Sequence, residues 1–288
     1  MEKIRTAIIP AAGFGTRWLP ASKSVPKEML PVWDRPGIQW VVEEAVAAGC
    51  ERILIINSLG KHAIEDHFDR APDLERALEE KKKTAALEGL RRLWSLADIH
   101  FIRQHEMKGL GHAVLQAESF AGGEPVAVLL PDDLFFGDKP AIGQLMEARV
   151  KHGGSVVALG RFPVEMLKGY GVPALGAWAD ERTVQIKHDV EKPAPEKMES
   201  DMGVVGRYVL EPEIFEALRK TKPGALGEIQ ITDAIDSLAR TGKVHGHLYA
   251  GERFDAGNPA GLLEATLFLA LRDPTSRDKV RGILKKFI

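Results

Sequence analysis

The chain alternates short apolar runs with segments of helical periodicity, and this alternation limits the fold more than any other feature. Four apolar runs in the first half each have the length of one strand; they lie at residues 6–10, 52–57, 99–103 and 126–130. Between them, four segments have a helical pattern, at residues 38–46, 61–68, 73–94 and 112–120. This order, with strands that are apolar on both faces, predicts a parallel sheet with crossover helices.

The second half of the chain has a different pattern. Residues 155–159 predict one more central strand, whereas the Gly- and Pro-containing segment 170–192 predicts antiparallel strands joined by loops. A further strand is expected at 204–210, followed by four helices at residues 211–220, 229–240, 259–272 and 274–287. Together these patterns predict one compact α/β unit with a β-rich lobe inserted in its second half.

Composition excludes several classes of protein. The 288 residues include 39 Lys and Arg against 41 Asp and Glu, so there is no excess of positive charge for wrapping a nucleic acid. The 44% hydrophobic content argues against disorder, and no apolar run approaches the ~18–20 residues of a membrane span. The single cysteine, Cys50, cannot form an internal disulfide, and the first residues do not resemble a signal peptide. We therefore expect a cytoplasmic enzyme with no nucleic-acid or membrane partner.

A Gly-rich stretch follows the first expected strand. Residues 11–17 read Ala-Ala-Gly-Phe-Gly-Thr-Arg, and such small residues let backbone N–H groups approach phosphate oxygens closely. The stretch lacks the third glycine of a dinucleotide-binding fingerprint and the Gly-Lys-Ser/Thr ending of a P-loop, so by itself it could be only a tight strand exit. Two cations, Arg17 in the stretch and Lys27 between Pro26 and Pro31, favour a phosphate site.

Two carboxylates are candidates for a metal site. Asp132 follows the apolar run that ends near Leu130, and Mg²⁺ prefers one or two carboxylates together with phosphates and water. Asp255 is the candidate for the second carboxylate, although only the fold could bring it near Asp132. The alternative is a structural role for Asp132, because Asp is common at turns and helix caps.

Five motifs, in this order along the chain, resemble the sugar-nucleotide pyrophosphorylases and in particular the bacterial UTP–glucose-1-phosphate uridylyltransferases. They are residues 11–31, Lys-Gly-Leu-Gly-His-Ala-Val at 108–114, Glu-Lys-Pro at 191–193, Val-Gly-Arg-Tyr-Val-Leu at 205–210 and Gly-Glu-Ile-Gln-Ile-Thr-Asp-Ala at 227–234. The resemblance implies an α/β, Rossmann-like nucleotidyltransferase fold: a mostly parallel central sheet flanked by helices, with a smaller β-rich sugar-binding lobe. It implies a single domain, 1–288, with a nucleotide-binding half at about 1–135 and a sugar-binding and closing half at about 136–288.

The same resemblance implies an enzyme, a nucleotidyltransferase that uses Mg²⁺ and forms UDP-glucose and pyrophosphate from UTP and α-D-glucose 1-phosphate. It also implies a homo-oligomer, either a dimer or a tetramer. The catalytic cations that it implies are Arg17, Lys27 and Lys192, and the metal ligands are Asp132 and Asp255. The residues implied to bind the nucleotide are Ala11, Ala12, Gly13, Gly15, Thr16, Gln104, Gly109 and Gly111. The residues implied to bind the sugar are Gly171, Glu191 and Val205.

The chain departs from the family pattern at two of its positions, and two other functions stay open. Pro173 stands where a small apolar residue is expected after Val172, and Ala256 stands where cysteine is commoner. The first alternative is the same chemistry with another pair of substrates, such as dTTP in a thymidylyltransferase, because a pocket resolves one methyl group by only about 1–3 kcal/mol. The second is a catalytically silent UDP-sugar-binding regulatory protein that retains the fold.

Overall fold

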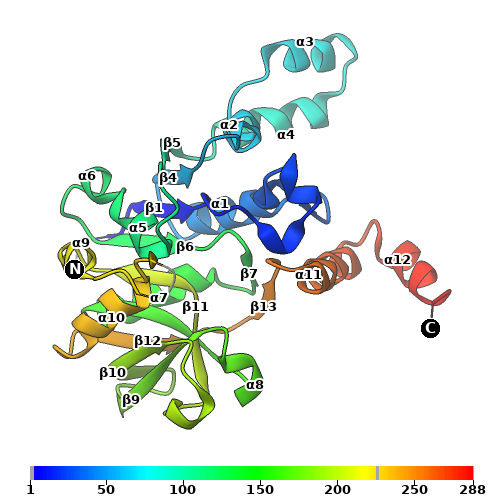
Figure 1. Cartoon of the computed structure of the whole chain (residues 1–288). Coiled ribbons are helices and arrows are strands. Elements are labelled where there is room, and N and C mark those ends of the chain that lie inside the picture. Colours follow the sequence, from blue (N-terminus) through cyan, green and yellow to red (C-terminus); the bar gives the residue numbers. More distant parts are fainter. Residues whose placement is uncertain (1–2, 225–226, 288) are drawn as a thin grey trace.

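One sheet runs through most of the chain in the computed structural model, which describes residues 3–224 and 227–287 (Figure 1). In spatial order, its strands within these residues are β5 (Asp98–Arg103), β4 (Arg52–Asn57), β1 (Thr6–Pro10), β6 (Val126–Leu129), β11 (Met202–Leu210), β8 (Ser155–Arg161), β12 (Val244–Leu248), β10 (Thr183–Glu191) and β9 (Gly171–Trp178). The strands that the sequence predicts are therefore present. Strands from both halves of the chain belong to this one sheet.

The sheet is mixed, so the expected mostly parallel arrangement holds only at one end. Strands β5, β4, β1 and β6 lie parallel to one another, and β12 lies parallel to β8. Strand β11 is antiparallel to β6 and β8, and β10 is antiparallel to β12 and β9. Between β9 and β10 the connection is too short for a crossover helix and allows only a hairpin. Strand β11 takes its direction from pairing with β6 and β8, which lie far from it in the chain.

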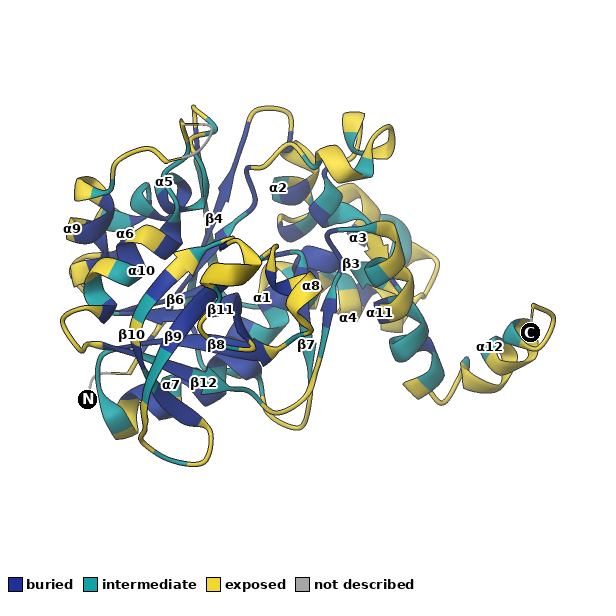
Figure 2. Ribbon diagram, turned by 60° about the horizontal axis from the view of Figure 1, so that its bottom comes forward, coloured by how far each residue is buried: buried dark blue, intermediate teal, exposed yellow. Residues whose placement is uncertain are grey.

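Successive residues of the central strands belong to two cores on opposite faces of the sheet. In β1, Ala7 and Ile9 belong to the first core, while Ile8 belongs to the second. The helices that contribute to the first core are α1 (Gly37–Ala47), α2 (His62–Phe68), α7 (Ala141–His152) and α11 (Pro259–Arg272). Those that contribute to the second are α5 (Leu110–Leu115), α6 (Glu118–Ala121), α9 (Glu213–Lys220) and α10 (Ile231–Ala239). Helices therefore cover both faces, and the strands between them are mostly buried (Figure 2).

Other elements were missed or differ from the sequence prediction. The helix expected at 73–94 is two helices, α3 (Pro72–Glu80) and α4 (Thr84–Trp94), because the chain turns at Lys82, where φ is 54°. The last helix, α12 (Arg277–Leu284), projects from the body (Figures 1 and 2). The remaining short elements are β2 (Pro31–Val32), β3 (Arg35–Pro36), α8 (Val164–Leu167) and the 3-10 helices η1 (Thr16–Trp18), η2 (Ala21–Lys23), η3 (Lys27–Met29) and η4 (Pro195–Lys197).

A second, two-stranded sheet brings distant segments of the chain together. It pairs β7 (Asp133–Phe136) with β13 (Glu252–Asp255), in a register that sets Asp133 opposite Asp255. The sequence did not predict this pair, since each strand is only four residues long. A boundary between two halves near residue 135 would fall inside β7. Within the described residues, no helix combines the length and apolar character that crossing a membrane requires.

Candidate active site

Two adjoining cavities open where β1, β5 and β6 end. The first has a volume of about 460 Å³ and includes the Gly-rich loop after β1. The second, of about 390 Å³, lies toward β9, β10 and β11. Both are lined by Asp132 and Glu191, so the cavities meet at these two side chains. In sheets of this kind ligands bind beyond the carboxyl ends of the parallel strands, which is where the cavities lie.

Most of the predicted site residues line one of these two cavities. Those in the first are Ala12, Gly13, Gly15, Thr16, Lys27, Gln104, Gly109, Asp132, Glu191 and Lys192. Those in the second are Arg17, Asp132, Gly171, Glu191, Val205 and Asp255. Ala11 and Gly111 line neither cavity. Each cavity takes residues from both halves of the chain.

Lys27 and Asp132, which the sequence analysis assigns to separate roles, form an ion pair. The Lys27 Nζ atom lies 2.5 Å from Asp132 Oδ2. Burial opposes ionisation of the Asp132 carboxyl, but the Lys27 ammonium outweighs burial and holds its pKa below the usual range. Burial likewise opposes the charge on Lys27, and the Asp132 and Glu28 carboxylates outweigh it and raise the pKa of Lys27. Both groups are therefore charged at neutral pH, and each compensates the other.

The Asp132 and Asp255 carboxylates face the same small space beside Gly257. A Cβ atom on Gly257 would lie 2.9 Å from Asp255 Oδ1 and 3.2 Å from Asp132 Oδ2. The backbone holds this arrangement, because Ala256 N donates to Asp132 O (2.8 Å) and Gly257 N donates to Asp255 Oδ1 (3.0 Å). Among the residues that the structure describes, no three or more His, Cys, Asp or Glu side chains form a complete metal site. Two carboxylates could hold Mg²⁺ only with additional ligands from a substrate or water.

Glu191 is the last residue of β10, and Lys192 follows it at the junction of the cavities. Glu191 is held on both sides, because its Oε2 accepts a hydrogen bond from Thr232 Oγ1 (2.5 Å) and its Oε1 lies 3.1 Å from Lys192 Nζ. Lys192 has a φ of 46°, a left-handed conformation that costs a side-chain-bearing residue about 1 kcal/mol or more. Such strain concentrates at functional sites, and here it turns the chain sharply after Glu191.

Gln104 lies at the inner wall of the first cavity and is 4% exposed. Its amide nitrogen lies within hydrogen-bond distance of Gly109 O (3.2 Å) and His112 Nδ1 (2.9 Å). In the described part of the chain the amide oxygen has no hydrogen-bond donor, so it is left to accept a hydrogen bond from a ligand. Gly109 and Gly111 allow the start of α5 to approach Ile229, since a Cβ atom at either position would lie within 2.8 Å of Ile229 O. The two glycines thus shape the cavity wall through packing.

The second cavity contains one cation with no partner and one strongly paired cation. Within residues 3–224 and 227–287, the Arg17 guanidinium makes no hydrogen bond or ion pair, so it is available to an anion. Arg253, which the sequence analysis missed, lies 2.5 Å from Asp133 Oδ1 and donates to Tyr170 Oη (3.1 Å). Burial raises the pKa of Asp133, although Arg253 opposes this effect. The position of Arg253 directly before the 254–258 segment was the only signal in the sequence.

Pro173 continues a strand, although the sequence analysis identified it as a departure from the family pattern. It lies in β9 opposite Asp189 of β10, and its carbonyl accepts a hydrogen bond from Ser200 Oγ (2.6 Å). Gly171, two residues earlier, lines the second cavity. The start of β9 therefore keeps its place beside β10.

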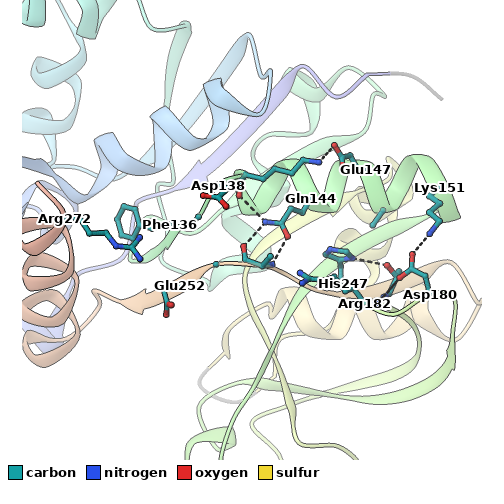
Figure 3. A pocket seen from close by; sticks show the side chains of 16 residues that line it. Phe136, Asp138, Gln144, Glu147, Lys151, Asp180, Arg182, His247, Glu252 and Arg272 are labelled. Atoms are coloured by element: carbon teal, nitrogen blue, oxygen red, sulfur yellow. Dashed lines mark hydrogen bonds and ion pairs between the residues drawn. The ribbon is translucent and has the colours of Figure 1, made fainter.

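A third cavity, of about 510 Å³, lies apart from these residues (Figure 3). Several of its charged side chains are paired with each other, including Lys139 with Glu147 and Lys151 with Asp180. Gln144 is likewise bonded to the backbone at Ala250. None of the predicted site residues lines this cavity. The pair of adjoining cavities, which contains most of the predicted cations and carboxylates, is therefore the candidate active site.

Comparisons with known proteins identify the family of the chain. A family model described as nucleotidyl transferase matches residues 6–271. A Bacillus subtilis protein named UTP–glucose-1-phosphate uridylyltransferase is 47% identical over 292 residues, covering 99% of each chain. A UTP-bound UGPase from Acinetobacter baumannii has a TM-score of 0.91 at 36% identity, covering 99% of this chain and 100% of that one. A UDP-glucose pyrophosphorylase complexed with UDP-glucose has a TM-score of 0.83 at 41% identity, covering 92% and 98%. The chain described here therefore belongs to the nucleotidyl transferase family of enzymes.

Proposed function

We propose that this chain forms UDP-glucose and pyrophosphate from UTP and α-D-glucose 1-phosphate. The observation that carries the proposal is the meeting of two cavities at Asp132 and Glu191, with Arg17, Lys27 and Lys192 around the junction. Two anionic substrates need adjoining sites and concentrated positive charge, and this arrangement supplies both. The printed names of the relatives, which refer to UTP, UDP-glucose and glucose 1-phosphate, support this choice of substrates.

The first cavity would bind UTP. The free amide oxygen of Gln104 suits the N3–H donor of uracil, and the Gly-rich loop residues Ala12, Gly13, Gly15 and Thr16 would contact the nucleotide through backbone groups. Ala11 and Gly111, which line neither cavity, would act through the packing of the loop and of α5. A 5-methyl group changes only one apolar contact of the base, so the kcat/KM for UTP should exceed that for dTTP by no more than the effect of one methyl group, about 1–3 kcal/mol.

The second cavity would bind the sugar, between Gly171, Glu191 and Val205. The Glu191 carboxylate is fixed by Thr232 and can accept hydrogen bonds from neighbouring sugar hydroxyls. Val205 is buried in β11 and would contact the apolar face of the ring. In this assignment about 1–135 is mainly the nucleotide half and about 136–288 mainly the sugar half, with Glu191 and Lys192 reaching across.

The reaction needs charge compensation and alignment more than covalent catalysis. A phosphate oxygen of the sugar phosphate attacks the α-phosphorus of UTP, and a new P–O bond forms. The bond from the α-phosphorus to the bridging oxygen breaks, and pyrophosphate leaves with its electron pair. Arg17, Lys27 and Lys192 would offset the repulsion between the two substrates and stabilise the negative charge on the leaving group.

Asp132 and Asp255 would hold Mg²⁺. The fit rests on the two carboxylates that face the same space beside Gly257, with room left for phosphate oxygens and water as further ligands. A bound Mg²⁺ would neutralise phosphate charge and polarise the phosphoryl group. The ion pair between Lys27 and Asp132 compensates the same carboxylate and keeps Lys27 close to the expected phosphates.

We also propose a cytoplasmic homo-oligomer, either a dimer or a tetramer. Helix α12 has no buried residue, and an isolated helix of eight residues is not stable in water. Leu263, Ile283 and Phe287 of the same C-terminal region are exposed apolar side chains. Burial raises the pKa of the only thiol, Cys50, to about 12, so this residue stays an inert thiol in a reducing compartment. Light scattering of the purified chain should give a mass of two or four chains.

The experiment that tests the proposed reaction measures pyrophosphate release with a panel of nucleotides and sugar phosphates. UTP with glucose 1-phosphate should give the highest kcat/KM, and release should stop when Mg²⁺ is chelated. If dTTP or another sugar phosphate gives a kcat/KM at least tenfold higher, the proposed substrates are wrong and that compound is the substrate. Tight UDP-glucose binding by calorimetry without turnover would favour the silent binding protein instead.

A further inference from the structure

A buried lysine outside both cavities holds the Gly-rich loop from behind. Lys61 lies between β4 and α2, and its side chain is 10% exposed. Its ammonium donates hydrogen bonds to Ala11 O (2.6 Å), to Gly13 O (2.7 Å) and to the Glu28 carboxylate (2.9 Å). An ammonium has three N–H donors, so these three partners use its whole capacity.

The bonds to Lys61 fix the direction of the peptide groups in the loop. In a trans peptide the carbonyl oxygen of one residue and the N–H of the next point in opposite directions. Because the carbonyls of Ala11 and Gly13 point at Lys61, the N–H groups of Ala12 and Phe14 point away from it. Ala12 and Phe14 line the first cavity, whereas Lys61 does not. Neither N–H group has a hydrogen-bond acceptor in the part of the chain that the structure describes.

The same lysine joins the loop to the segment that carries Lys27. Glu28, the side-chain partner of Lys61, follows Lys27 in η3, and its side chain is 1% exposed. A Cβ atom on Gly15 would lie 3.3 Å from the Cβ and Cγ atoms of Lys27, so the loop and the Lys27 stem are already in contact. The Lys61–Glu28 pair therefore sets the loop donors and the Lys27 ammonium in one fixed arrangement.

We propose that Lys61 is a positioning residue for the nucleoside triphosphate, and that it acts through the Ala11 and Gly13 carbonyls and through Glu28. This inference rests on the proposed function of the first cavity. Free, pre-oriented N–H donors bind phosphate or base oxygens without reorganisation, and this advantage is lost when the loop can rotate its peptide groups. The sugar phosphate lies in the other cavity and should be affected much less.

The test compares Lys61→Met with a control at another buried ion pair. Lys61→Met keeps an unbranched side chain of similar length and removes the ammonium. The KM for UTP should rise about 10- to 100-fold, as expected for loss of charge-assisted hydrogen bonds, while the KM for glucose 1-phosphate should change less than about twofold. The control is Glu211→Gln, which weakens the buried pair with Arg149 (2.7 Å) away from both cavities. This control should lower Tm and leave both KM values unchanged.

An unchanged KM for UTP in a folded Lys61→Met variant, with only a lower Tm, would overturn the proposal. If that variant does not fold, Glu28→Gln decides, because it keeps an acceptor for Lys61 and should raise the KM for UTP severalfold; no change there would also overturn the proposal. Calorimetric titration with UTP separates this inference from the reaction. A wild-type chain without turnover would contradict the proposed function, while a weaker Kd for UTP in the Lys61 variant would still support the positioning role.

Discussion

The walls of the two cavities differ at one buried charge, although both contain buried ion pairs, such as Arg253 with Asp133 in the second. Around the first cavity each buried charge has a partner, as in Lys61 with Glu28 and Lys27 with Asp132. Behind the second cavity, Asp189 is 4% exposed, and neither of its carboxylate oxygens has a hydrogen-bond partner in the described part of the chain. Its oxygens lie 3.2 Å from the Cβ position of Gly171, which lines that cavity.

This difference indicates what each wall is built to do. Compensated pairs hold the nucleotide loop in one geometry before a ligand arrives, because breaking a buried pair is costly. Asp189 instead lies among other acids, with Glu191 on its own strand and with Asp233 and Asp236 on α10. Burial, together with the charge of Glu191, raises the pKa of Asp189 to about 7. On the sugar side, the charge of this one buried carboxyl therefore changes near neutral pH.

The largest expected loss of activity is at Asp132, which lines both cavities. Asp132→Asn should lower turnover by at least about 100-fold, because it removes a carboxylate that would hold Mg²⁺ and leaves Lys27 without its partner. Pyrophosphate release over a range of Mg²⁺ concentrations measures the loss, and circular dichroism checks that the fold is retained. Near-normal turnover in a folded variant would remove Asp132 from the proposed metal site.

A smaller loss is expected for the exposed cation at the junction. Lys192→Gln should lower kcat by about 10- to 100-fold, since one well-placed charge at a developing phosphate charge is lost. Its side chain is 56% exposed, so Tm should hardly change. Lys187→Gln is the matched control, because Lys187 is an exposed lysine on β10, the strand that Lys192 follows. Equal kcat values for the two variants would argue against a role for Lys192 in the reaction.

A third substitution separates the sugar side from the nucleotide side. Thr232→Val keeps the shape of the side chain and removes the hydroxyl that donates to Glu191 Oε2. The KM for glucose 1-phosphate should rise about 3- to 10-fold, the effect of one lost hydrogen bond, and the KM for UTP should not change. A rise in the KM for UTP instead would contradict the division between the cavities. Thr241→Val, in an exposed position after α10, is the control.

The smallest effect on activity, but a clear one on stability, is expected at Asp189. The Asp189 carboxyl loses its proton near pH 4 in the unfolded chain and near pH 7 in the folded chain. Between these two pH values the folded state therefore binds more protons than the unfolded state. Stability contributed by this group therefore falls as the pH rises from 4 to 7. Asp189→Asn removes the dependence, and its Tm should increase relative to wild type between pH 5 and pH 8.

Thermal unfolding at the two pH values measures this difference. Asp138→Asn, at an exposed carboxylate, should follow the wild-type pH dependence. A constant difference in Tm between Asp189→Asn and wild type at pH 5 and pH 8 would show that Asp189 does not titrate in the folded chain between these pH values. The contrast between the two walls would then be wrong.

The parts of the molecule that the sequence predicts well depend on local pattern. The strands before Ala11 and Asp132 are continuous apolar runs, and the small residues and cations of the loop are contiguous, so their roles follow from short stretches. The antiparallel strands at 170–192 were predicted and are present as β9 and β10, but the antiparallel direction of β11 within the central sheet was not, because it depends on pairing between segments far apart in the chain. Four-residue strands such as β7 carry no period long enough to detect.

The site residues that were missed act through contacts between distant segments. Lys61 reaches Ala11 across 50 positions, and Thr232 reaches Glu191 across 41. Lys61 lies just before helix α2, and Thr232 lies in the first turn of a different helix, α10. Both are ordinary features in a sequence, so only the fold gives these residues a role at the site. Asp255 was a candidate only as a carboxylate, and its role as a metal ligand came from the resemblance to a family, since nothing in the spacing alone relates it to Asp132.

The most direct test of the account is a structure of the chain with UDP-glucose and Mg²⁺. The account predicts the uracil against Gln104, the glucose beside Glu191 and Gly171, and the metal between Asp132 and Asp255. Binding in the reverse orientation, or binding only in the third cavity around Gln144, would contradict it.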